Sequence, residues 1–263
     1  MLKNVCRVGL VGAATLAVSV CAQAQLLQGN LLLRQTAATN LGMVNQVFSD
    51  FPTFSTGMGS MVTTPVAWNI SDIQIFQIGS TAAVNTWFGN VNQATLNVSR
   101  QTAGAPDASV DPTSSTNSGA SIVYSGLVSV VLDEGTANAL GANQSFRMTA
   151  ATGAITQLQG LPAGNYVFSL AGNAPFGTLG QTFTGAANLT GTDDYVRNTG
   201  GGFALPSTTN WGTLFSDFST SGAVQGTQWG IGINGAVVPE PASLAALGLG
   251  ALALIRRRRS NRA

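Results

Sequence analysis

Short segments in which apolar and polar residues alternate recur along the middle of this chain, and they limit its fold more than any other feature. In the segment 94–100, Leu96 and Val98 share one face, while the polar residues Thr95, Asn97 and Ser99 occupy the other. This period of two residues is typical of a β-strand that turns one face toward a core. Similar segments, separated by turn residues, lie at 68–76, 121–133, 145–150, 154–160, 161–172 and 227–235. The pattern predicts a fold of many short strands.

The segment 68–76 fits this pattern only in part. Trp68 and Ile70 alternate onto one face, whereas Ile73 and Ile75 alternate onto the other. A regular strand across this segment would therefore leave neither face purely apolar. We still expect a strand here, with a period that is only partly regular.

The composition supports a packed core of strands. Hydrophobic residues make up 44% of the chain and charged residues only 8%, against roughly 25% charged residues in a typical soluble protein. We expect an all-β fold, a jelly-roll-like β-sandwich ectodomain over residues 25–236. The polar stretch 102–121 is expected to be a surface loop, and it leaves open a division into two smaller domains. A helix is plausible only around 30–51, where strands fit equally well.

Residues 1–24 have the features of a secretory signal peptide. A positively charged start is followed by an apolar stretch, and Ala22 and Ala24 place small residues where signal peptidase requires them. We expect a signal helix that is cleaved after Ala24, so that the exported chain begins at Gln25. An uncleaved membrane anchor is the alternative, but the apolar run is short for a full span.

The charges of the chain are concentrated at its two ends. The formal net charge is +1, yet residues 25–236 contain four arginines and nine carboxylates, a net charge of about −5. An acidic body argues against nucleic-acid binding, which needs a basic face. The same region contains no His, Lys or Cys. The usual nucleophile–base triads, thiol proteases and His-bearing zinc sites are therefore excluded, and no cofactor is expected.

Residues 237–263 contain three elements in a fixed order. The motif Pro239-Glu240-Pro241 comes first and an apolar run at 242–255 follows. The tail is then closed by a basic cluster of four adjacent arginines, Arg256, Arg257, Arg258 and Arg259.

The apolar run would form a helix of about 21 Å, shorter than the roughly 30 Å hydrocarbon core of a bilayer. The four arginines at its C-terminal end match the helix dipole and favour the cytoplasmic side. We expect a short transmembrane helix that spans transiently, with the arginines as its basic anchor, because arginine side chains can snorkel and the bilayer can thin.

This tail resembles the PEP-CTERM sorting signal of Gram-negative bacteria, from Val238 to Arg259. The resemblance implies export, with signal peptidase and the membrane enzyme exosortase as processing partners and a cut near the motif. It also implies deployment at the cell surface or in the matrix, often with exopolysaccharide and biofilm. Glu240 and its prolines would then be a recognition element. "WNISDIQIF", "LPAGNYVFSL" and "WGIGINGAVVPEP" look like the β-sandwich ectodomains often found before this tail.

For the body itself, we expect a structural or adhesive matrix protein that is not an enzyme. The alternative is a glycan-binding module, for which Trp87 and Trp211 are the better candidates for exposure because Asn and Gly surround them. A glycoside hydrolase that uses two carboxylates is a third reading. No metal site is expected, because the acidic residues in 107–111 and 193–194 lack the spacing of a calcium loop.

Overall fold

The computed structural model describes residues 25–29, 42–44, 46–48, 55–101, 110–112, 114–133, 143–174, 182–187, 195–198, 212–213, 228–229 and 231–239. Strands predominate among these residues.

Some of the residues singled out from the sequence lie outside this part of the chain. They are Ala22 and Ala24 of the signal segment, Trp211, the motif residues Glu240 and Pro241, and the basic anchor Arg256, Arg257, Arg258 and Arg259. The signal segment 1–24 and the apolar run 242–255 lie outside it as well. The predictions of a signal helix, a transient membrane helix and a basic anchor therefore stay predictions.

The strands of the first half are β1 (Gln25–Gly29), β2 (Gly42–Val44), β3 (Gln46–Phe48), β4 (Ser55–Thr64), β5 (Trp68–Ser80), β6 (Gln93–Arg100) and β7 (Ile122–Asp133). The strands of the second half are β8 (Asn143–Ala151), β9 (Gly164–Ala174), β10 (Thr182–Ala187), β11 (Tyr195–Asn198), β12 (Gly212–Thr213), β13 (Gln228–Trp229) and β14 (Ile231–Val237). Helix α2 covers Thr81–Asn90, and a 3-10 helix covers Thr156–Leu158.

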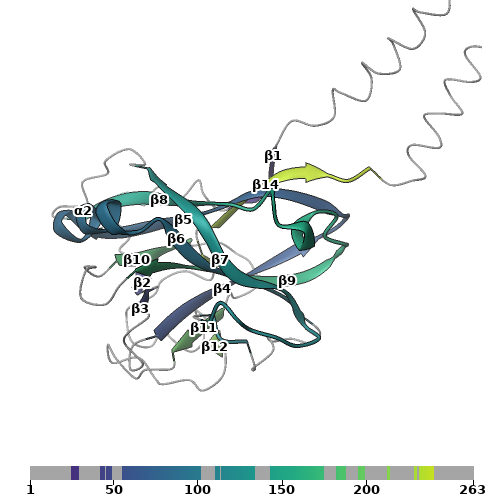
Figure 1. Cartoon of the computed structure of the whole chain (residues 1–263), viewed down its shortest axis with the longest axis horizontal. Coiled ribbons are helices and arrows are strands. Elements are labelled where there is room, and N and C mark those ends of the chain that lie inside the picture. The colour runs from purple at the N-terminus through teal and green to yellow at the C-terminus, as the bar shows by residue number, and fades with distance from the viewer. Residues whose placement is uncertain are drawn as a thin grey trace, which may run out of the picture.

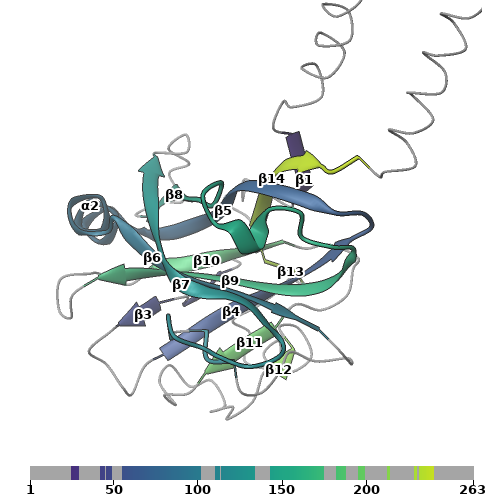
Figure 2. The same ribbon diagram turned by 45° about the vertical axis from the view of Figure 1, so that its right-hand side comes forward.

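These strands form a nearly closed, largely antiparallel sheet. Its main path runs β1-β14-β5-β8-β7-β6-β9-β3-β4-β11-β12, and β10 connects β5 with β2 and β13. The short β3–β9 pair is parallel. Strand β7 joins the two portions of the sheet, since its residues 122–129 pair with β6 and its residues 130–133 pair with β8. Figures 1 and 2 show the strands crossing one another as the sheet curls.

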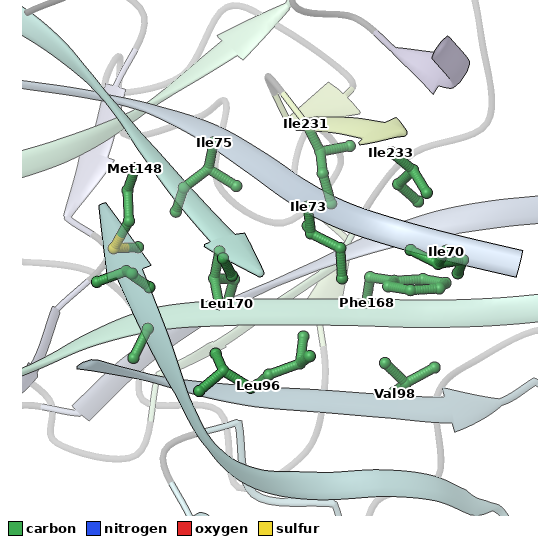
Figure 3. Packing of buried hydrophobic residues seen from close by; sticks show 14 of the residues in the cluster. Ile70, Ile73, Ile75, Leu96, Val98, Met148, Phe168, Leu170, Ile231 and Ile233 are labelled. Carbon is green, nitrogen blue, oxygen red and sulfur yellow. The ribbon is translucent and has the colours of Figure 1, made fainter. Parts of the chain in front are cut away.

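The hydrophobic core lies between two facing portions of this sheet. Ile73 and Ile75 of β5 project toward Phe168 and Leu170 of β9, as Figure 3 shows. Other fully buried members of the cluster are Ile70, Leu96, Val98, Phe146, Met148, Ile231 and Ile233. The predicted alternation is confirmed for β8, where Phe146 and Met148 are buried on one face.

A bulge in β5 explains the irregular period of 68–76. Trp68 and Ile70 are buried, and so are Ile73 and Ile75, although a regular strand would place the two pairs on opposite faces. The register supplies the reason, because Asn234 of β14 is opposite Asp72 and Gly235 is opposite Ile70, so that Ser71 is an extra residue. An extra residue shifts the side-chain phase by one and returns the apolar positions to the core.

Two other expectations from the sequence require correction. The segment 154–160 is not a strand: it forms a turn and the 3-10 helix, after Thr152 donates its N–H to the Ser71 carbonyl. The only helix we considered plausible was at 30–51, but α2 forms at 81–90, and the described residues 42–44 and 46–48 are strands. Helix α2 follows β5 directly, and its buried face consists of Ala83, Val84 and Trp87.

Strand β6 also differs from expectation, because both of its faces are buried. Leu96 and Val98 belong to the core, as predicted. The polar face, formed by Thr95, Asn97 and Ser99, is covered as well.

Among the described residues, no helix is long and apolar enough to cross a membrane.

Candidate functional site

The Pro-Glu-Pro motif begins only one residue after β14 ends. Val237, the last residue of β14, pairs with Trp68 of β5, and the Val238 N–H donates to the Ala67 carbonyl over 2.8 Å. Pro239 has no N–H to donate, and it is exposed. We call these five residues, Ala67, Trp68, Val237, Val238 and Pro239, the β14 exit. The hydrogen-bonded ladder thus ends where the motif begins.

Trp68 fixes the β14 exit to the rest of the fold. Its backbone N–H donates to the Leu161 carbonyl over 2.9 Å, and the Leu161 N–H donates back to the Trp68 carbonyl over 2.8 Å. Its side chain is only 3% exposed. Val237, the last residue of β14, therefore lies opposite a residue that is itself held on its other side.

Gly235 allows β14 to approach β5 closely at the bulge. A Cβ atom at this position would lie 2.0 Å from the Asn69 carbonyl oxygen, well inside van der Waals contact. The obstructing atom belongs to the backbone, so it cannot rotate away as a flexible side chain could. Any residue other than glycine would therefore push the two strands apart, two residues before β14 ends.

The carboxylate beside the bulge is engaged in hydrogen bonds. Asn234 Nδ2 and Gln74 Nε2 donate to Asp72 Oδ1 over 2.6 and 3.0 Å, and Ser71 Oγ donates to Asp72 Oδ2 over 2.8 Å. The bond from Asn234 joins β14 to β5 beside the bulge. Asp72 thus stabilises the register of the two strands.

The expectation that Trp87 is exposed is wrong. Its side chain is 0% exposed and packs against Phe146, with 5.6 Å between ring centroids, and it lies over Gly172 of β9. The Asn and Gly residues around it belong to a helix whose apolar face covers the sheet. Trp87 therefore cannot stack on a glycan in this fold.

Most of the other described tryptophan and tyrosine side chains are buried too. Trp68, Tyr166 and Tyr195 are all less than 5% exposed. Trp211 lies outside the described residues, and the side chain of Trp229 is not described. The described part of the chain thus assembles no exposed tryptophan cluster.

Tyr166 donates its hydroxyl proton to the Pro162 carbonyl over 2.9 Å. Burial raises the pKa of this phenol above its ordinary value of 10.0, while the nearby Arg100 guanidinium partly opposes the shift. Arg100 also lies 5.9 Å from the Tyr166 ring centroid. Tyr166 is therefore a neutral, hydrogen-bonded residue of the core.

A cluster of polar side chains on β6 and the neighbouring loop was missed by sequence reasoning. Buried Asn97 directs its Nδ2 toward the carbonyls of Pro112 and Ser114, at 3.1 and 3.0 Å. Asn117 donates to Asn97 Oδ1 over 2.9 Å and to the Asp111 carbonyl over 2.7 Å. We call these five residues the asparagine cluster; Ser125 extends it, since its Oγ accepts from the Asn117 N–H.

The asparagine cluster fixes the described part of the loop 110–121 over β6. It satisfies loop carbonyls that would otherwise be buried without donors. Val110 and Pro112 are buried beside it. The loop thus covers the polar face of β6, whereas its composition had predicted only a surface loop. The sole sequence signal was two asparagines spaced twenty residues apart, which is too weak to identify a cluster.

The described carboxylates do not converge on a catalytic centre. Asp133 at the end of β7 forms an ion pair with Arg147 of β8, and Asp72 is engaged as described above. Among the residues described, no group of three His, Cys, Asp or Glu side chains could hold a metal ion. The feature of the described structure with a functional assignment is therefore the β14 exit.

Comparison with protein families supplies that assignment. The PEP-CTERM protein-sorting motif matches residues 237–259, a range that ends with the arginine cluster. Its first two residues, Val237 and Val238, are the two that close the β14–β5 ladder. No curated protein and no solved structure matches the chain. The motif indicates an exported protein that exosortase processes at the membrane. The chain thus carries a PEP-CTERM sorting motif, which begins at the last residue of the final strand of a β-rich domain.

Proposed function

We propose that this protein is a cell-surface or extracellular-matrix component with a structural or adhesive role, and that it is not an enzyme. The observation that carries the proposal is the sorting motif attached without a spacer to β14. The export route, signal cleavage before Gln25 and exosortase processing of the tail, would deliver the domain outside the inner membrane. There its facing sheet portions would act as a β-sandwich scaffold within exopolysaccharide or biofilm.

Two features of the body support a non-catalytic role. Residues 25–236 lack His, Lys and Cys, and the described carboxylates Asp72 and Asp133 stabilise strand pairs. An acidic body also suits a hydrated matrix, because like charges keep the domain soluble. The chain would contact the membrane only transiently, through the apolar run 242–255.

Fractionation and intact-mass measurement of the exported protein test the sorting route. We expect a chain that begins at Gln25 and lacks the arginines 256–259. Glu240→Ala should leave the tail attached and the protein in the membrane fraction. Glu134→Gln changes the only other glutamate of the chain and serves as the matched control. Full-length protein that retains its four arginines outside the cell would contradict the proposal.

A glycan array with the exported protein separates the structural role from the glycan-binding alternative. We expect no selective binding, since Trp68 and Trp87 are in the core. Selective binding that is lost in Trp211→Ala would favour a lectin-like module instead. Hydrolysis of a polysaccharide by the same preparation would replace both readings with a glycosidase.

A further inference from the structure

Strand β14 is held on both sides along most of its length. Residues 231–237 pair with β5, and residues 232–235 also pair with β1. Its Ile231 and Ile233 side chains are fully buried. Residues 232–235 of this strand therefore have a neighbouring strand on each side.

The two processing points lie at the same end of this ladder. Gln25, the expected first residue after signal cleavage, is directly opposite Gly235. Because β1 and β14 are antiparallel, the start of one strand lies beside the end of the other. Figure 1 shows β1 and β14 together at one edge of the domain. A folded domain would thus present both ends of its mature chain to the membrane from one side.

A peptide-bond-cleaving enzyme that binds its substrate in extended form needs free backbone groups on both sides of the cut. Val238 does not offer them, since its N–H is bonded to the Ala67 carbonyl, and Val237 just before it lies within the ladder opposite Trp68. Pro239 is the first residue beyond these bonds. The bonds up to and including Val238–Pro239 are therefore protected as long as the ladder is intact.

We propose that the folded β1–β14–β5 ladder sets the boundary of tail removal, so that exosortase cuts only after Pro239. This inference rests on the proposed function. In the cut, the amide C–N bond breaks, the acyl carbon passes to water or to an acceptor amine, and the leaving amine takes up a proton. The mature protein then retains Val237, Val238 and Pro239, and its ladder remains complete.

The same geometry predicts that a spacer accelerates the reaction. The enzyme must approach a motif that begins at the surface of a folded sheet. Inserting Gly-Ser-Gly-Ser between Val238 and Pro239 moves the motif away without altering the ladder. We expect severalfold faster loss of the tail in pulse-chase labelling, with the released chain still ending after the inserted residues.

Opening the ladder should move the cut upstream. Gly235→Ala places a Cβ 2.0 Å from the Asn69 carbonyl oxygen, so β14 must separate from β5 near its end. We expect new C-termini before Val238 in intact-mass spectra. Gly153→Ala is the matched control, since its added Cβ would lie 3.8 Å from the nearest atom, the Ser71 carbonyl oxygen. The spacer variant tests the proposal even if Gly235→Ala does not fold.

The wild-type protein gives the decisive reading. A single product that ends at or after Pro239 supports the proposal. A wild-type product that ends before Pro239, or a spacer that leaves the rate unchanged, overturns it while the sorting function stands. Retention of the whole tail in the wild type overturns the sorting function itself, and the two failures are thereby distinguished.

Discussion

The β14 exit and the asparagine cluster hold their segments in place by different means. At the β14 exit the contacts are backbone hydrogen bonds, and glycine at 235 permits a close approach of two strands. At the asparagine cluster, side-chain amides on β6 and the loop bind backbone carbonyls of the loop. The difference teaches that the end of the terminal strand depends on its backbone and on the absence of a Cβ at one position, whereas the loop depends on two side-chain amides.

The largest expected effect on stability comes from disturbing the close backbone approach of β14 to β5. Gly235→Ala should reduce the free energy of unfolding by about 3 kcal/mol, because the added Cβ forces a backbone shift in the sheet. Urea unfolding of the exported protein, followed by tryptophan fluorescence, measures it. Gly153→Ala should change stability by less than about 0.5 kcal/mol. Equal losses in the two variants would remove the argument for close approach.

The next-largest effect on stability comes from removing a side-chain amide of the asparagine cluster. Asn97→Ala should reduce the free energy of unfolding by about 2 kcal/mol, since the buried Pro112 carbonyl and the half-buried Ser114 carbonyl lose a donor. Proteolysis within 110–117 should also become faster. The control is Asn92→Ala, which truncates an exposed asparagine just before the same strand. A stable, protease-resistant Asn97→Ala protein would show that the loop is held by other contacts.

Tyr166 is linked both to β6 and to the segment that holds Trp68. Loss of its hydroxyl should reduce the free energy of unfolding by less than Asn97→Ala does. It lies opposite Arg100 at the end of β6, and its hydroxyl donates to the Pro162 carbonyl. Pro162 follows Leu161, whose backbone is hydrogen-bonded to Trp68 of the β14 exit. Tyr166→Phe should cost about 1 kcal/mol at neutral pH through the lost hydrogen bond. Urea unfolding at pH 7 measures this difference.

The pH dependence of the same variant gives a second test. Because the folded-state pKa of Tyr166 is raised above 10.0, the unfolded chain releases this proton first as pH rises. Stability should therefore be unaffected well below pH 10 and should fall as pH rises from about 10 toward the folded-state pKa. Unfolding between about pH 8 and pH 11.5 should show a shallower decline in Tyr166→Phe. Identical slopes would contradict the assigned burial effect.

The smallest effect comes from a contact outside both regions. The Arg147–Asp133 ion pair joins β8 to β7, but both side chains are more than a third exposed. Arg147→Met should therefore change stability by less than about 1 kcal/mol. The difference from wild type should shrink further at high salt. A loss of stability as large as that of Asn97→Ala would contradict this expectation, because the ion pair would then stabilise the fold as much as the asparagine cluster does.

Much of the strand content followed from local patterns, and the exceptions have specific causes. The core-facing residues Leu96 and Val98 of β6 and the alternation of β8 were predicted because alternation is a local property of the backbone, whereas the burial of the polar face of β6 was not. The bulge at Ser71 was not, because it depends on the register with β14. The helix at 81–90 was missed because it is short, and Val84, Trp87 and Phe88 are its only large apolar residues.

By itself, the sequence determined the sorting motif, since its three elements lie in consecutive residues and need no folding to be recognised. It also determined the β-rich class. Only the tertiary structure decided that Trp87 is buried, that Asn97 meets Asn117, and that β1 lies beside β14. These facts depend on pairing between residues far apart in the chain, which local periodicity does not encode. Both the sequence and the tertiary structure were needed to place the motif relative to the last hydrogen bond of β14.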